Sequence, residues 1–387
     1  MMDGNVVASL TCLSLAVISC STDHDLLAQK PNAGVDGGLD SSGGPDGDHP
    51  SRDAFTASDG RDPEPPGPWM LTLLNGVVDQ DAVRFCFARV TDGGEEAPDL
   101  APMPKAPGLP FGAKMVLPAL TGVDFATMDV HPYLVLGASE APADFTCRTI
   151  LARRQNGEDA DVGAAGPVAV SLPLLPAGTL ADARSYLAVA TGCALEWPEV
   201  DAGTTDAGAA DATVDATLDA GPDRADVCGR AASAQAGLLL VRLSRTNFSY
   251  QLGFQVVHAS AATPAASLAL DNGATNLTLF FADDLNLGQI DPRNQPGLVE
   301  RSIFGPSLGT ARVRIHAANS NAFPSIERSL SAVLLQSQLQ ESSLLDGHNY
   351  SFVMLGAGAG KAVGDPFQPF RTVLVENAPR LDGPEPQ

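Results

Sequence analysis

The sequence contains few aromatic residues, few basic residues and a single long uncharged apolar run. Two Trp, four Tyr and 15 Phe stand among 387 residues with 38 Gly and 30 Pro, and apolar segments are short. This pattern favours β-rich structure over helical bundles. Lys and Arg number 23 against 46 Asp and Glu, which argues against a nucleic-acid partner because phosphate binding needs a basic surface. The apolar run, residues 6–19, is 14 residues long and too short to span a bilayer.

Motifs that mark an active site are few. The sequence shows no H-E-x-x-H motif and no Ser–His arrangement. Its histidines are scattered over strand-like and turn positions or lie in the polar N-terminal part. We therefore predict that the chain is not an enzyme, and we expect no cofactor and no metal site.

The apolar run ends at Cys20, and this junction is the strongest indication of where the protein acts. The run has the length of the apolar region of a secretory signal peptide, although Met1–Asn5 carries Asp3 and no basic residue. Val17–Cys20 resembles a bacterial lipobox, in which a small residue precedes a cysteine that is lipidated and becomes the mature N-terminus. The resemblance implies a signal peptide over 1–19 and a lipid anchor at Cys20, with an ordinary cleaved signal as the alternative.

Two acidic segments contain too little apolar surface to offset the entropy of ordering. Residues 20–67 are rich in Gly, Asp, Ser and Pro and predict a disordered tether, with a reach of roughly 35–40 Å for a flexible coil. Residues 200–227 carry seven Asp against Arg224. Calcium binding is the alternative for this second segment, but its Asp residues recur every four or five positions, unlike the closer spacing of an EF-hand loop. We expect a solvated loop.

A repeat organises the rest of the chain. Residues 180–192 align without gaps on residues 344–356, and in each copy an Asp is followed four residues later by a Tyr that opens an apolar strand. The pattern resembles the tyrosine corner of immunoglobulin-like sandwiches, in which the Tyr hydroxyl bonds back to upstream backbone. A strand that begins with Tyr by chance is the alternative. The four residues are Asp182, Tyr186, Asp346 and Tyr350.

The openings of the two copies also align, residues 72–87 with residues 255–270. In the second copy, Val256–Ser260 and Pro264 precede a later Gly-x-x-Tyr at Gly347. These residues are similar to family 4397 of bacterial exported domains of unknown function, over residues 250–378. The resemblance implies a β-sandwich on the cell exterior and no established activity. We expect His258 to tie its turn by hydrogen bonding, with a ligand role as the alternative.

Four cysteines remain after Cys12 leaves with the signal peptide and Cys20 is assigned to lipid. An even number in an exported chain indicates two disulfides, and three connectivities are open. A bridge from Cys193 to Cys228 would close the base of the acidic loop, and Cys86 would then pair with Cys147. Metal binding is the alternative, but the sequence has no C-x-x-C motif and no His within four residues of these cysteines.

These observations predict an all-β protein with two tandem immunoglobulin-like antiparallel β-sandwiches after a disordered tether. The leading function is a cell-envelope lipoprotein that acts as a surface binding or adhesion module, anchored in a membrane, at the outer membrane or a periplasm-facing membrane or the cell surface. We expect an envelope protein or polysaccharide as its partner. A structural spacer without a specific ligand is the alternative. The predicted segments are the signal peptide 1–19, the tether 20–67, the first sandwich 68–246, the second sandwich 250–378 and the tail 379–387.

Overall fold

Strands are the predominant secondary structure in the part of the chain that the computed structural model describes. That part comprises residues 69–117, 119–136, 145–156, 167–180, 184–195, 228, 236–245, 250–273, 275, 277–293, 296–304, 310–317, 325–357 and 367–378. All of these residues belong to one compact unit, residues 57–387, which is distinct from residues 1–56. The prediction of an all-β protein is confirmed.

The described strands and helices fall into two halves along the chain. The strands of the first half are β1 (Met70–Val77), β2 (Ala82–Thr91), β3 (Gly94–Glu96), β4 (Leu109–Pro110), β5 (Lys114–Val116), β6 (Val130–Leu136), β7 (Val168–Ser171), β8 (Ser185–Gly192) and β9 (Gly237–Leu243). Those of the second half are β10 (Gln251–His258), β11 (Ala266–Asn272), β12 (Leu277–Leu285), β13 (Ile290–Asp291), β14 (Gly297–Glu300), β15 (Arg312–Ala317), β16 (Ile326–Ser329), β17 (Asn349–Leu355) and β18 (Arg371–Glu376). The helices are α1 (Cys147–Gln155), η3 (Arg301–Phe304), α3 (Leu330–Gln336) and η5 (Glu341–Ser343).

Each half contains two sheets. We name them sheet I (β5-β1-β8-β9) and sheet II (β3-β2-β6-β7, with β4 on β2) in the first half. Sheet III (β13-β10-β17-β18, with β14 on β10) and sheet IV (β12-β11-β15-β16) form the second half. Because β8 and β9 are antiparallel neighbours in sheet I, residues 196–227 lie in the chain between two strands of one sheet.

The two halves repeat the same strand register. The opening strand pairs in parallel with the Tyr strand in both, with Leu71 opposite Tyr186 in sheet I and Phe254 opposite Tyr350 in sheet III. The second strand pairs antiparallel in both, with Phe85 opposite Leu134 and Leu268 opposite Ile315. These pairings match the alignment of the openings and of the Tyr strands, so the sequence repeat is a structural repeat. The parallel pair in sheets I and III is a feature that the sequence did not predict.

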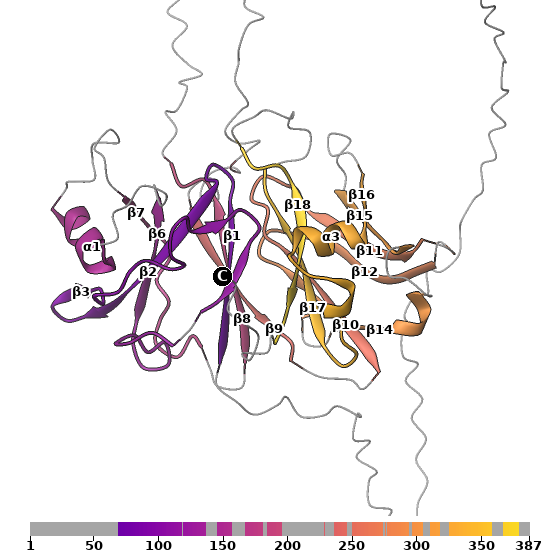
Figure 1. The fold of residues 1–387 in the computed structure, drawn as a ribbon, viewed down its shortest axis with the longest axis horizontal. Helices are drawn as coiled ribbons and strands as arrows, with labels where there is room; N and C mark the ends of the chain where they lie inside the picture. Colours follow the sequence, from indigo (N-terminus) through magenta and orange to yellow (C-terminus); the bar gives the residue numbers. More distant parts are fainter. Residues whose placement is uncertain are drawn as a thin grey trace, which may run out of the picture. The chain divides into compact units, whose positions relative to one another are not determined.

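The four sheets follow one another as layers (Figure 1), and three apolar cores lie between them. Leu73 of β1, Phe85 of β2 and Ala188 of β8 belong to the core between sheets I and II. Phe254 and Phe352 belong to the core between sheets III and IV. The third core contains side chains from the opposite faces of sheets I and III, among them Leu74, Leu187, Val189, Val257, Val353 and Val373. Sheets I and III therefore pack against each other and are covered on both faces, so the order of layers is II, I, III, IV.

Hydrogen bonds cross the contact between sheets I and III. The Lys114 ammonium on β5 donates to the Leu374 carbonyl on β18 at 2.7 Å. The Arg371 guanidinium donates to the Phe111 carbonyl at 3.3 Å and stacks on the Phe111 ring at 4.6 Å from its centroid. The backbone N–H of Gln368 donates to the Val78 carbonyl at 2.7 Å. These polar contacts at the border of the third core therefore fix how sheets I and III lie against each other.

A buried amide network holds the connection between the halves. The backbone N–H of Ser244, just after β9, donates to Gln255 Oε1 at 3.0 Å. The Asn349 and Asn377 side-chain amides donate to the Ser244 carbonyl at 3.2 and 3.0 Å. Because all of these polar groups are buried and paired, the network fixes where the second half begins.

Candidate functional site

The candidate site lies on the outer face of sheet II, where α1 covers part of the sheet. Ile150 and Leu151 of α1 are buried against Tyr133, Val135 and neighbouring side chains of β2, β6 and β7. Thr146 caps the helix, since its hydroxyl accepts from the Thr149 N–H while the Thr149 hydroxyl accepts from the Thr146 N–H. This capping box satisfies backbone donors that a helix start otherwise leaves open.

Disulfides join both predicted cysteine pairs. Cys86 on β2 is bonded to Cys147 at the start of α1, with 5.5 Å between their Cα atoms. Cys193 is bonded to Cys228, with 5.3 Å between the Cα atoms. The first bridge attaches α1 covalently to sheet II, and the second joins the two ends of the segment that contains the acidic residues 200–227.

Four polar side chains meet beside α1, and we call them the His131 cluster: Glu95, His131, Tyr133 and Ser171. His131 Nδ1 lies 2.5 Å from Glu95 Oε1, and the Tyr133 hydroxyl donates to Glu95 Oε2. His131 Nε2 lies 2.7 Å from Ser171 Oγ. The residues come from β3, β6 and β7, so the strand order of sheet II brings them together.

The cluster keeps Glu95 ionised. Burial raises the pKa of this carboxyl, but the hydrogen bonds from Tyr133 and His131 outweigh burial and the net pKa of Glu95 is lowered. Burial, followed by the bond to Glu95, raises the pKa of the Tyr133 hydroxyl. Tyr133 therefore remains a hydrogen-bond donor, and Glu95 remains a fixed anion in the wall beside α1.

The order Ser171–His131–Glu95 invites comparison with a catalytic triad, whose histidine must accept the serine proton through Nε2. Here Nε2 also lies 2.8 Å from the Leu172 carbonyl oxygen. A carbonyl only accepts hydrogen bonds, so the Leu172 oxygen competes with the Ser171 hydroxyl for this nitrogen. In a triad the serine hydroxyl has the Nε2 lone pair to itself, so the cluster is a poor match to a nucleophile and base pair.

A groove of about 600 Å³ opens beside the cluster, and we call it the α1 groove. Glu95 contributes to its wall, Leu151 of α1 to its apolar surface, and the 121–122 turn to another side. The lining residues are Arg89, Glu95, Glu96, Ala97, Pro98, Asp99, Leu100, Thr121, Gly122, Arg148, Leu151, Ala152 and Gln155. Its volume lies in the range of small-ligand pockets, about 300–1,000 Å³.

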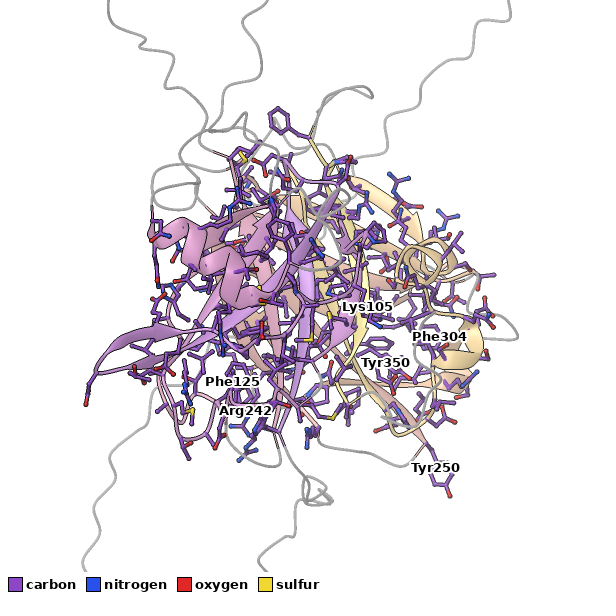
Figure 2. The ribbon with its side chains drawn as sticks, turned by 60° about the vertical axis from the view of Figure 1, so that its left-hand side comes forward. Lys105, Phe125, Arg242, Tyr250, Phe304 and Tyr350 are labelled. Atoms are coloured by element: carbon purple, nitrogen blue, oxygen red, sulfur yellow. A yellow bond between two sulfur atoms is a disulfide. The ribbon has the colours of Figure 1, made fainter. Side chains whose placement is uncertain are left out.

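The second Tyr of the repeat makes the backbone contacts expected of a tyrosine corner. The Tyr350 hydroxyl donates to the Ser343 carbonyl at 2.7 Å and accepts from the Leu345 N–H at 2.8 Å. Figure 2 shows Tyr350 within the fold, whereas Tyr250 projects away from it. Asp346 is exposed on the turn before β17.

Other predicted site residues lie partly outside the described residues. Tyr186 is buried in β8 opposite Leu71. Cys20, Asp182 and the acidic residues 200–227 lie outside the described residues, and so do the signal peptide and the tether.

His258 ends β10 and contacts its own turn. His258 Nε2 lies 3.0 Å from the Pro264 carbonyl oxygen, and the Gly288 N–H donates to the His258 carbonyl at 2.8 Å. Burial lowers the pKa of this imidazole. Asn75 occupies the aligned position of the first half, where its side-chain amide donates to the Leu109 carbonyl at 2.9 Å and its side-chain oxygen accepts from the Val77 N–H at 3.0 Å. The His258 side chain therefore contacts its own turn, whereas the Asn75 side chain bonds β4 and the end of β1.

Sequence reasoning missed the His131 cluster and the α1 groove. His131 and Tyr133 are two residues apart in a strand, and this spacing places both on one face. That signal was available, but Glu95 and Ser171 lie 36 and 40 residues from His131 in the chain. Only the order of strands in sheet II brings them to it.

No group of three or more His, Cys, Asp or Glu among the described residues is arranged to hold a metal ion. Within the same ranges, no helix is long and apolar enough to cross a membrane. The chain matches no protein-family model, and no curated protein matches it.

Proposed function

We propose that the protein is an exported, lipid-anchored module of the cell envelope that binds a partner through the α1 groove. The groove carries this proposal, because it combines a small-ligand volume with walls on a disulfide-linked helix and a paired sheet. Rigid walls reduce the ordering cost of binding. An envelope protein or polysaccharide is the partner class that the predicted location favours.

The proposed location is supported by the disulfides and by the N-terminal sequence. Two bridges in one chain are typical of proteins that fold in oxidising compartments. Cys20 is the proposed lipid anchor, with residues 20–67 as its tether. The likeness of residues 250–378 to an exported β-sandwich family, and the division into sandwiches at 68–246 and 250–378, belong to the same proposal.

A structural spacer is the second candidate, because the third core favours it. Sheets I and III share that core and leave little freedom between the halves, which suits a rigid element with no ligand. We propose no enzymatic activity, since the Leu172 carbonyl engages the nitrogen of His131 that a triad would need.

Filling the α1 groove distinguishes the binding module from the spacer. Ala152 is exposed on α1 and lines the groove, so Ala152→Trp would occupy it. Leu335→Trp on α3 provides a matched control at an exposed position that does not line the groove. In pull-downs against envelope proteins and polysaccharides, we expect the wild type and Leu335→Trp to retain a partner and Ala152→Trp to lose it. Equal retention by all three would contradict the proposed role of the groove.

The lipid anchor is tested separately in cells. Metabolic labelling with a palmitate analogue should mark the wild-type chain and leave Cys20→Ala unlabelled. Equal labelling of both chains, or of neither, would remove Cys20 as the anchor and leave the groove unaffected.

A further inference from the structure

We propose that the α1 groove takes a short aliphatic peptide that carries both a free ammonium end and a free carboxylate end. This inference rests on the proposed function, because it names the ligand of the same groove. The evidence is the state of the charged side chains that line the groove. Some of them are already paired within the protein, and others are not.

Two of the acidic groups in the lining are already engaged by the protein. Arg89 and Glu96 form an ion pair with each other, and each neutralises the other. Glu95 accepts one hydrogen bond on each carboxylate oxygen, from His131 and from Tyr133. These groups shape the wall, but their charge is largely satisfied within the protein.

Two opposite charges in the lining remain open. Arg148 uses only its Nε, in a long 3.4 Å bond to the Ala97 carbonyl, so the rest of its guanidinium fork is free for a carboxylate. Asp99 is exposed, and no ion pair or hydrogen bond engages its side chain among the described residues. Arg148 and Asp99 line the same groove without pairing with each other. One free cation and one free anion favour a zwitterion over a ligand with a single charge.

The apolar part of the lining is aliphatic. Leu151 is buried beneath the groove, and Ala97, Pro98, Leu100 and Ala152 complete this surface. No aromatic ring is among the residues that line it, so the groove offers no stacking face for a flat ligand. The volume of about 600 Å³ exceeds the needs of a single amino acid and suits two or three residues. The groove therefore favours a short free peptide, of the kind that cleavage of an envelope protein yields, over a polysaccharide.

The test removes one charge at a time from each side. The probes are the dipeptide Ala-Leu, its N-acetyl form and its C-terminal amide, titrated by calorimetry into the full chain. Removing either ligand charge should weaken binding by about tenfold, the size expected for loss of a charge-assisted hydrogen bond. In Arg148→Met the amide should bind as the dipeptide does, and in Asp99→Asn the acetylated form should do so, because the matching partner is already lost.

The control variant is Arg328→Met, which removes an exposed arginine on β16 that does not line the groove. It should bind all three probes as the wild type does. Equal binding of the three probes by the wild type, or no binding of Ala-Leu at millimolar concentration, would overturn the proposal. If Ala-Leu fails while Ala152→Trp still abolishes partner retention, the ligand class is wrong and the binding function stands. If Ala-Leu does not bind and Ala152→Trp retains the partner as the wild type does, the binding function itself is contradicted.

Discussion

Lys114 should make the stability of the protein rise with pH between about 8 and 10. Its ammonium lies at the border of the third core and donates to the Leu374 carbonyl at 2.7 Å. Burial lowers the pKa of this amine to about 8, and the Glu376 charge offsets only part of the effect. An exposed lysine in the unfolded chain titrates near 10.4.

The sign of the pH dependence follows from proton binding in the two states. Between pH 8 and 10.4 the unfolded chain retains the lysine proton and the folded chain has lost it, so unfolding becomes less favourable as pH rises. The slope approaches about 1.4 kcal/mol per pH unit, and the whole window is worth about 3 kcal/mol. Below pH 8 both states are charged, and the folded protein carries the full cost of burying the ammonium.

The measurement is the free energy of unfolding in urea at pH 7, 8, 9 and 9.5 without reductant. Lys114→Met keeps an apolar stem of similar length and should abolish the rise. Tyr350 and Tyr133 do not titrate in the folded protein at these pH values, because burial raises the pKa of Tyr350 to about 12 and raises that of Tyr133. They lower stability only above about pH 10, where tyrosines of the unfolded chain ionise.

Lys105→Met is the matched control, since Lys105 is exposed. It should retain the wild-type slope. An equal slope in Lys114→Met and the wild type would refute the assignment of the pH dependence to Lys114.

Three further predictions concern the fold. Tyr350→Phe should lower the free energy of unfolding by about 1–3 kcal/mol, because the Leu345 N–H and the Ser343 carbonyl lose their partner. The double change Cys86→Ala, Cys147→Ala should cost about 4 kcal/mol on the loop-entropy model for a separation of 61 residues, measured by urea unfolding. Gly76→Ala should destabilise by about 1–3 kcal/mol, as overpacking does, because its Cβ would lie 2.8 Å from the Ala190 carbonyl oxygen and 3.0 Å from Leu355.

The controls for these predictions are exposed positions of the same residue types. Tyr250→Phe should leave stability unchanged, since Tyr250 is 83% exposed. Gly93→Ala should do the same, because its Cβ would meet only Thr91 Oγ1 at 3.8 Å. A loss as large in Tyr250→Phe as in Tyr350→Phe, or in Gly93→Ala as in Gly76→Ala, would contradict the reasoning. For the Cys86–Cys147 bridge, a urea midpoint of the double variant equal to that of the wild type would contradict the reasoning.

The repeat and the disulfides could be predicted because their signals are local or few. The Tyr strands carry an apolar run after a turn, and four cysteines allow only three pairings. The third core was harder to predict. Leu74 and Leu73 point to opposite faces of β1, and both are buried, so β1 is a strand with two covered faces. The side chains that cover this second face come from sheet III in the other half of the chain, and only the tertiary structure brings them there.

The candidate site could be predicted least. Helix α1 is short, and its buried side chains include Cys147, whose bridge to Cys86 fixes it on sheet II. Such a helix is too short to show the periodic apolar pattern from which a helix is predicted. The groove depends on α1, β3 and the 121–122 turn meeting at one place, and this is a property of the tertiary structure alone.

The parallel pairing of the opening strands has a consequence for how fast the protein folds. Leu71 finds Tyr186 more than a hundred residues later in the chain, and Phe254 finds Tyr350 nearly a hundred residues later. Contacts this distant in sequence form only after long loops have closed, and loop closure costs entropy before the contacts stabilise the chain. Such contacts therefore slow folding. During synthesis β1 leaves the ribosome before β8 has been made, so the apolar side chains on both faces of β1 stay exposed until β8 is available. The same strands that are best protected in the finished protein are therefore the most exposed to aggregation before it is complete.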